Sequence, residues 1–174
     1  MSLSFYEVSV ESYLRTLRAV DNILNRAELH ATESELDLEE LVRYRLRDDM
    51  LPFSFQVISV WHHSMGTIRA MKAGLFEPPP RMSDMTFAKC KALIAEAISE
   101  LESVSEEEIN GLGGKPMLFR LGDREMPFTT NAFLTSFSIP NFYFHAATTY
   151  DVLRIHGVPL GKMDFLGALK LGAE

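Results

Sequence analysis

The chain has 174 residues, 47% of them hydrophobic and 24% charged, and its 24 acidic and 17 basic residues give a formal net charge of −7. This length and composition predict one globular domain over residues 1–174, and the acidic balance argues against a nucleic-acid partner, which would require a basic face. No apolar run approaches the ~20 residues that span a bilayer, and a lone cysteine without a signal-peptide pattern predicts a cytoplasmic protein without membrane contact.

The first predicted element is a long amphipathic helix from Phe5 to about His30. Ser4 is placed to cap it, because a serine side chain there accepts a backbone N–H. A polar stretch then leads to a short helical turn near residues 41–46. Apolar residues recur along the long helix at the spacing of one helix face, and they are Val10, Leu14, Leu17, Leu24 and Ala27.

The second long helix is expected to begin at Asp48 or Asp49, since aspartate is a good N-cap. Pro52 then falls in the first turn, where its missing N–H costs nothing, and Gly74 ends the helix. The segment FEPPPRM after it is a loop, because three prolines cannot continue a helix. The apolar stripe of this helix consists of Leu51, Ser54, Val57, Trp61, Met65 and Ile68.

The third helix is expected to open at Ser83 or Asp84. Its apolar seam contains Cys90, which predicts an inert core thiol rather than a nucleophile. The seam is typical of a bundle helix, and it consists of Phe87, Cys90, Ile94, Ala97, Leu101 and Val104.

A small β-hairpin is expected next, with MLFRL and REMPF flanking the two-residue turn Gly122-Asp123. The last helix runs from about Thr130 to His156, bends at Pro140 and ends at Gly157.

The remaining tail, VPLGKMDFLGALKLGAE, is expected to be irregular and then briefly helical. Lys162 and Asp164 are placed to cap or pair where the tail packs across the end of the helices. The predicted fold class is all-α: a four-helix bundle with a long crossover and a small β-hairpin before the last helix.

One glycine-rich motif fails on inspection. GLGGK at 111–115 lacks the spacing of a phosphate-binding loop, and Lys115 is followed by Pro116 where that loop has serine or threonine. We therefore interpret it as a flexible loop.

Two adjacent histidines come directly after Trp61 in the second helix. Neighbours on a helix diverge by about 100°, so His62 and His63 cannot both point at one ion. His62 is expected to lie nearer the interior, whereas His63 falls on another sector together with Gln56.

His145 lies on an inward stripe of the last helix. Its neighbours four residues away are Asn141 and Thr149, so the same face carries no second histidine. Three interpretations stay open: a hydrogen-bonded core residue, a metal ligand together with His62, or a general acid or base.

Three segments resemble a family of uncharacterised domains in the DinB/YfiT-like metalloenzyme superfamily. They are FYEVSVESYLRTLRAVDNIL, RYRLRDDMLPFSFQV and IPNFYFHAATTYDVLRIHGVPLGKMDFLG, and they extend from one end of the chain to the other. The resemblance implies a DinB-like four-helix bundle and a homodimer. It also implies a divalent metal such as zinc or nickel, held in many members by one histidine on the second helix and two spaced by four on the last.

Two functional hypotheses stay open. In the first, His145 and His62, with Gln56 or Asn141 supplying oxygen, hold a divalent ion in a metal-assisted transferase or hydrolase acting on a small molecule. In the second, the chain is a dimeric, metal-free and non-enzymatic protein, either stress-related or holding an apolar ligand in a pocket. The pocket candidates are Trp61, Asn141, Phe142, Tyr143, His145 and Thr149.

Overall fold

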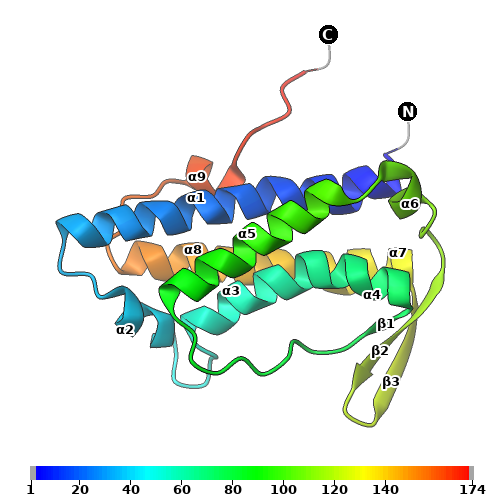
Figure 1. The fold of residues 1–174 in the computed structure, drawn as a ribbon, viewed down its shortest axis with the longest axis horizontal. Helices are drawn as coiled ribbons and strands as arrows, with labels where there is room; N and C mark the ends of the chain where they lie inside the picture. Colours follow the sequence, from blue (N-terminus) through cyan, green and yellow to red (C-terminus); the bar gives the residue numbers. More distant parts are fainter. Residues whose placement is uncertain (1–2, 173–174) are drawn as a thin grey trace.

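The computed structural model describes residues 3–172, which form a mostly helical domain with a small three-stranded sheet (Figure 1). The helices, with π-helical turns marked η, are η1 (Glu7–Glu11), α1 (Ser12–Glu33), α2 (Leu38–Arg43), α3 (Phe53–Trp61), η2 (His62–Gly66), α4 (Thr67–Ala73), α5 (Phe87–Ser103), α6 (Glu106–Asn110), α7 (Thr130–Phe133), η3 (Leu134–Ser138), α8 (Ile139–Ile155) and α9 (Lys162–Leu166). The strands are β1 (Leu75–Phe76), β2 (Pro116–Leu121) and β3 (Arg124–Thr129).

Four long helical segments lie side by side in Figure 1: η1–α1, α3–η2–α4, α5 and α7–η3–α8. The α1 helix contacts α5 and α8, and α3 contacts the same two helices from the other side. One apolar core fills the space between them. Within residues 3–172, no helix combines the length and the apolarity needed to cross a membrane.

The start of the first helical segment agrees with the sequence prediction. Ser4 Oγ accepts the backbone N–H of Glu7 at 3.0 Å, and Glu7 Oε2 accepts the N–H of Ser4 at 2.7 Å. This reciprocal capping box satisfies two backbone donors that the helix leaves unpaired. The helix continues to Glu33, three residues beyond the expected end.

The start of α3 differs from the prediction that Asp48 or Asp49 caps it. The helix begins at Phe53, after Pro52 in an extended conformation. The N–H of Phe53 donates to the carbonyl oxygen of Tyr44 at 2.8 Å, so the chain between these residues forms a closed loop. The two aspartates lie in that loop, and Pro52 is the N-cap residue directly before the helix.

The start of α5 is also later than expected. Thr86 caps it by accepting the N–H of Lys89 at 3.2 Å. Asp84 has a φ of 54°, which excludes it from a right-handed helix. Cys90 is fully buried in the core, as predicted, and burial raises the pKa of its thiol to about 12.

The predicted hairpin is confirmed, with β2 antiparallel to β3 and Gly122 at a φ of 59° in the turn. The sequence did not predict β1, which pairs in parallel with β2 through Leu75 and Leu118. Gly74 ends α4 with a φ of 77°, as expected. The sheet lies at the end of the domain where α4 and α7 meet it (Figure 1).

The tail lies against α1 after the last long helix ends at Ile155. Asp164 Oδ2 accepts the N–H of Gly161 at 2.7 Å, which caps α9, and its Oδ1 accepts from Arg26 at 2.5 Å. Asp164 therefore caps and pairs as expected, but the segment packs along α1 rather than across the end of the helices. Lys162 is exposed.

Candidate functional site

The side chain of Gln56 fixes the orientation and the tautomer of His145 between α3 and α8. Gln56 is 3% exposed, and its Nε2 donates to the carbonyl oxygen of Leu51 at 2.9 Å. Its Oε1 therefore faces Nδ1 of His145, 2.7 Å away, and can only accept. The imidazole carries its proton on Nδ1, and Nε2 keeps its lone pair.

His63 supplies the second imidazole of this site. Its ring centroid lies 6.1 Å from that of His145, with 13° between the two planes. The residue is 7% exposed, and its Nδ1 is a buried nitrogen with no hydrogen-bond partner among residues 3–172. A buried polar atom without a partner is costly in a folded protein and often marks a functional position.

His62 is turned away from this pair. Its Nε2 donates to the carbonyl oxygen of Glu77 at 2.7 Å, and its ring packs on Phe76. The prediction that His62 lies nearer the interior than His63 is wrong. The reason is that α3 is buried on nearly every side, so its single apolar stripe does not mark the only inward face. Of the proposed metal ligands, the structure joins His145 to Gln56 and places His62 elsewhere.

A buried hydroxyl network supports the backbone beneath His63. Ser138 Oγ donates to the carbonyl oxygen of His63 at 2.8 Å, and lies 2.6 Å from Thr67 Oγ1 and 2.8 Å from the hydroxyl of Tyr13. His63 belongs to the π-helical turn η2, and Ser138 ends the π-helical turn η3. Such turns change carbonyl pairing and occur often at functional sites.

Burial keeps both imidazoles of the site neutral near pH 7. It lowers the pKa of His145 from 6.5 to about 4. Burial lowers the pKa of His63 to about 3, and the neighbouring His62 and His145 contribute to that lowering. Both rings therefore offer nitrogen lone pairs rather than positive charge.

These residues form an incomplete ligand set for a metal ion. Within residues 3–172, no group of three His, Cys, Asp or Glu side chains could hold one. The oxygen of Gln56 already accepts from His145, so it is an orienting group and not a third ligand. Two imidazoles fall short of the three protein ligands that zinc sites use.

Two phenylalanines flank the His145 ring. The ring of Phe55 meets it edge to face at 6.0 Å, and that of Phe144 does so at 5.1 Å. Phe144 is 58% exposed and lies beside the partly buried imidazole. Aromatic side chains therefore border the imidazole of His145 on two sides.

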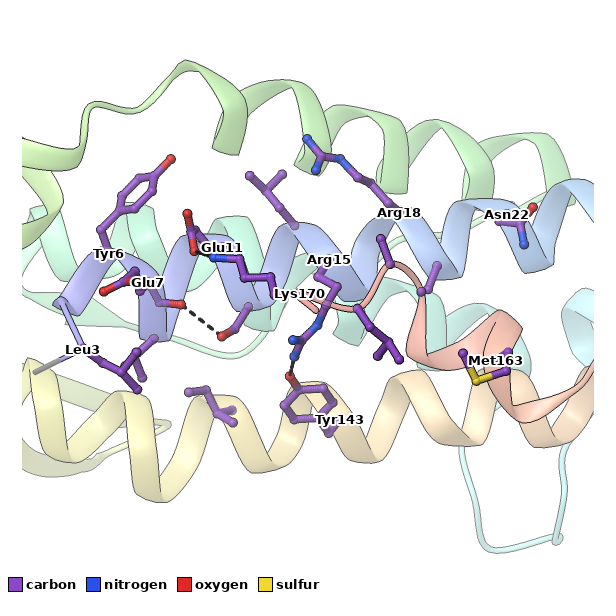
Figure 2. A pocket seen from close by; sticks show the side chains of 18 of the residues that line it. Leu3, Tyr6, Glu7, Glu11, Arg15, Arg18, Asn22, Tyr143, Met163 and Lys170 are labelled. Atoms are coloured by element: carbon purple, nitrogen blue, oxygen red, sulfur yellow. Dashed lines mark hydrogen bonds and ion pairs between the residues drawn. The ribbon is translucent and has the colours of Figure 1, made fainter. Parts of the chain in front are cut away.

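The other pocket candidates take separate roles. The amide of Asn141 donates to the Phe137 carbonyl at 2.7 Å, and the hydroxyl of Thr149 donates to the His145 carbonyl at 2.9 Å. Trp61 is 8% exposed, and its indole N–H is buried without a partner in the described part of the chain. Tyr143 lies on the opposite side of α8 from these residues and lines a groove against α1 (Figure 2).

Sequence reasoning missed His63, Phe55 and Phe144 as members of the site. A usable signal was present for His63, because it lies seven residues after Gln56 and shares its helix face. The flanking phenylalanines carry no comparable signal, since a phenylalanine in a helix is ordinarily core.

Comparisons with known proteins agree with this architecture. The chain is similar to a solved DinB family member protein from Shewanella denitrificans, with 25% identity, a TM-score of 0.80, and 97% of this chain and 95% of that chain covered. The fold is thus DinB-like. The family model Domain of unknown function (DUF1993) matches residues 5–166, and the chain belongs to this family. No curated protein matches it. The resemblance noted in the sequence is confirmed.

Proposed function

We propose that the His63–His145 site binds a small aromatic molecule that donates one hydrogen bond to Nε2 of His145, inside a four-helix bundle of the DinB type. The observation that carries the proposal is the Gln56–His145 hydrogen bond, which fixes the proton on Nδ1. A hydrogen-bond acceptor held by a buried partner is preorganised for a ligand. The edge-to-face rings of Phe55 and Phe144 favour an aromatic body beside it.

Binding is a better match than base catalysis for this imidazole. A general base works best when its pKa lies near the working pH. Burial lowers the pKa of His145 to about 4, so its conjugate acid is too strong for efficient proton abstraction at neutral pH. The same lowering keeps the lone pair available as an acceptor.

Phenol and anisole make a matched pair of probes, because only phenol donates a hydrogen bond. We expect phenol to shift the ring signals of His145 in an NMR titration and to bind about 3- to 10-fold more tightly than anisole, the value of one hydrogen bond. His145→Gln abolishes this preference, whereas His156→Gln, at the end of α8, leaves it unchanged. Equal binding of both probes, or binding of neither, contradicts the proposal.

A metal-assisted transferase or hydrolase is the second candidate, favoured by the two neutral imidazoles and the unpartnered Nδ1 of His63. Elemental analysis of protein purified without chelator or affinity metal decides between them. If the protein carries near one equivalent of zinc or nickel, and both His145→Ala and His63→Ala lose it, the metal-assisted enzyme is established and metal-free ligand binding is overturned. Protein without metal that still prefers phenol supports ligand binding.

We also propose that the protein is a cytoplasmic homodimer, as the resemblance to the DinB/YfiT-like superfamily implies. Light scattering coupled to size-exclusion chromatography tests the oligomeric state, with twice the monomer mass expected. A monomer at micromolar concentration contradicts it.

A further inference from the structure

We propose that the groove between α1, the start of α8 and the C-terminal tail binds an amphipathic carboxylate, with an apolar chain along the groove and its carboxylate on Arg15. Figure 2 shows this groove, and its volume is about 930 Å³, the size of a small-molecule site. It lies on the face of α8 that carries Tyr143, not on the face of His145, so it is separate from the histidine site.

The lining of the groove is mainly apolar. Val8 and Leu14 on the first helical segment face Ile139 and Tyr143 at the start of α8. Met163 lines it from the tail and is 58% exposed, together with Leu169 at 49%. Apolar side chains that remain exposed along one groove favour an apolar partner, because covering them removes them from water.

Within residues 3–172, every charged side chain around the groove except Arg15 has a charged or backbone partner. Glu7 accepts the N–H of Ser4, and Glu11 forms an ion pair with Lys170. The remaining ion pairs join Arg18 to Glu102 at 2.7 Å and Asp164 to Arg26 at 2.5 Å.

Arg15 itself has a single polar contact. Its Nη2 lies 3.5 Å from the hydroxyl of Tyr143, and within residues 3–172 no carboxylate lies within ion-pair distance of it. Figure 2 shows the guanidinium directed at Tyr143 across the groove. A guanidinium and a phenol hydroxyl, side by side above an apolar surface, provide the donors that a carboxylate needs.

The C-terminal tail contacts the η1–α1 segment on both sides of Gly167 and so forms one side of this groove. Gly167 has a φ of 65°, and a Cβ there would lie 3.2 Å from the carbonyl oxygen of Arg15, so glycine allows the close approach to α1. The ion pairs of Asp164 with Arg26 and of Lys170 with Glu11 hold the tail on either side of Gly167. The groove is therefore lined by elements from both ends of the chain.

Decanoate and decanol, used below the micellar concentration, have the same apolar chain length, but only decanoate carries a carboxylate. Comparing them distinguishes recognition of the carboxylate from binding of the apolar chain. We expect decanoate to bind in isothermal titration calorimetry and to shift the methyl signals of Ile139. Arg15→Met weakens decanoate at least tenfold and leaves decanol unchanged, while Arg15→Lys keeps part of the affinity. Arg18→Met is the matched control, because Arg18 lines the groove but is already paired, and it retains decanoate binding.

Three results overturn the proposal. Decanoate does not bind; Arg15→Met and Arg18→Met weaken it equally; or a second copy of the chain covers the groove, so that Ile139→Glu converts a dimer to a monomer and decanoate has no access. Thermal melts of each variant confirm folding, which exposed arginines on α1 should not disturb. Phenol binding at His145 is unaffected in every case, so the two sites are tested separately.

Discussion

The side-chain oxygen of Gln56 and Nδ1 of His145, 89 residues apart in the chain, lie 2.7 Å from each other. This hydrogen bond joins α3 to α8 between the buried side chain of Gln56 and the partly buried imidazole of His145. Because Gln56 is itself held by the Leu51 carbonyl, the imidazole has one tautomer and one orientation.

Gln56→Glu places a carboxylate against the imidazole and is expected to raise the pKa of His145 from its lowered value by at least about one unit, since a nearby negative charge favours the protonated ring. An NMR titration of the histidine ring signals measures this. The His156 ring, bonded to the Val152 carbonyl, serves as the internal reference. An unchanged titration of His145 would mean that Gln56 does not face it in solution.

Stability is expected to fall as the pH is lowered from 7 to 5. The pKa of His145 is about 4 in the folded protein and 6.5 ordinarily, and that of His63 is about 3, so the unfolded chain binds more protons throughout this window. Unfolding is then favoured on acidification, by on the order of 1–2 kcal/mol for each histidine. The stabilising shifts of Glu7 and Asp164, whose pKa values are lowered, are lost only at more acidic pH.

Urea denaturation at several pH values measures this dependence. His63→Gln and His145→Gln should each flatten the slope between pH 7 and 5, whatever they do to stability at pH 7. A wild-type stability independent of pH over this range would show that the imidazoles are not buried neutral.

Ser138→Ala is expected to destabilise the protein by about 2 kcal/mol, because it removes a shared partner from Tyr13, Thr67 and the His63 carbonyl. Denaturation of the variant measures the loss. Ser136→Ala is the matched control on the same turn: its hydroxyl is exposed, and the expected change is below about 0.5 kcal/mol. If the two substitutions lowered stability equally, the hydroxyl network around Ser138 would not contribute to the stability of the fold.

Asp164→Ala is expected to cost about 1 kcal/mol, since it removes the cap on Gly161 and the partner of Arg26. Lys162→Ala, in the same turn and exposed, is the control. A loss for Asp164→Ala of less than about 0.5 kcal/mol, the range of unconstrained surface sites, would show that the tail is not held through this carboxylate.

Local signals in the sequence were enough to predict several boundaries of the helices and the hairpin. Ser4, Gly74 and Gly122 act through their own backbone and immediate neighbours, so their roles are visible without the fold. Asp48 and Ser83 have the chemistry of caps and yet do not cap, because contacts such as Phe53 with Tyr44 decide where the chain enters a helix. Such contacts join segments that no local pattern connects.

The site was only partly predictable for a related reason. The spacing of apolar residues correctly predicted that His145 faces the interior, and the segment around it carried the family resemblance. The choice between His62 and His63 depended on which side of α3 faces α8, and a helix buried on nearly all sides gives no contrast between its faces. The parallel pairing of Leu75 with Leu118 was beyond reach because two residues are too short for a strand pattern.

The π-helical turns also indicate where relatives of this chain can gain or lose single residues. Each is one residue longer than the α-helical turn it replaces, so a relative that lacks one has a deletion of one residue inside an otherwise matching helix. In alignments with relatives, gaps are therefore expected within 7–11, 62–66 and 134–138 rather than in the loops. Because an ordinary α-helical turn then replaces the longer turn, the rest of that helix keeps its orientation. A deletion within 62–66 instead changes which residue of the turn lies beside His145, where His63 lies here, so one deletion is enough to change the chemistry of the site.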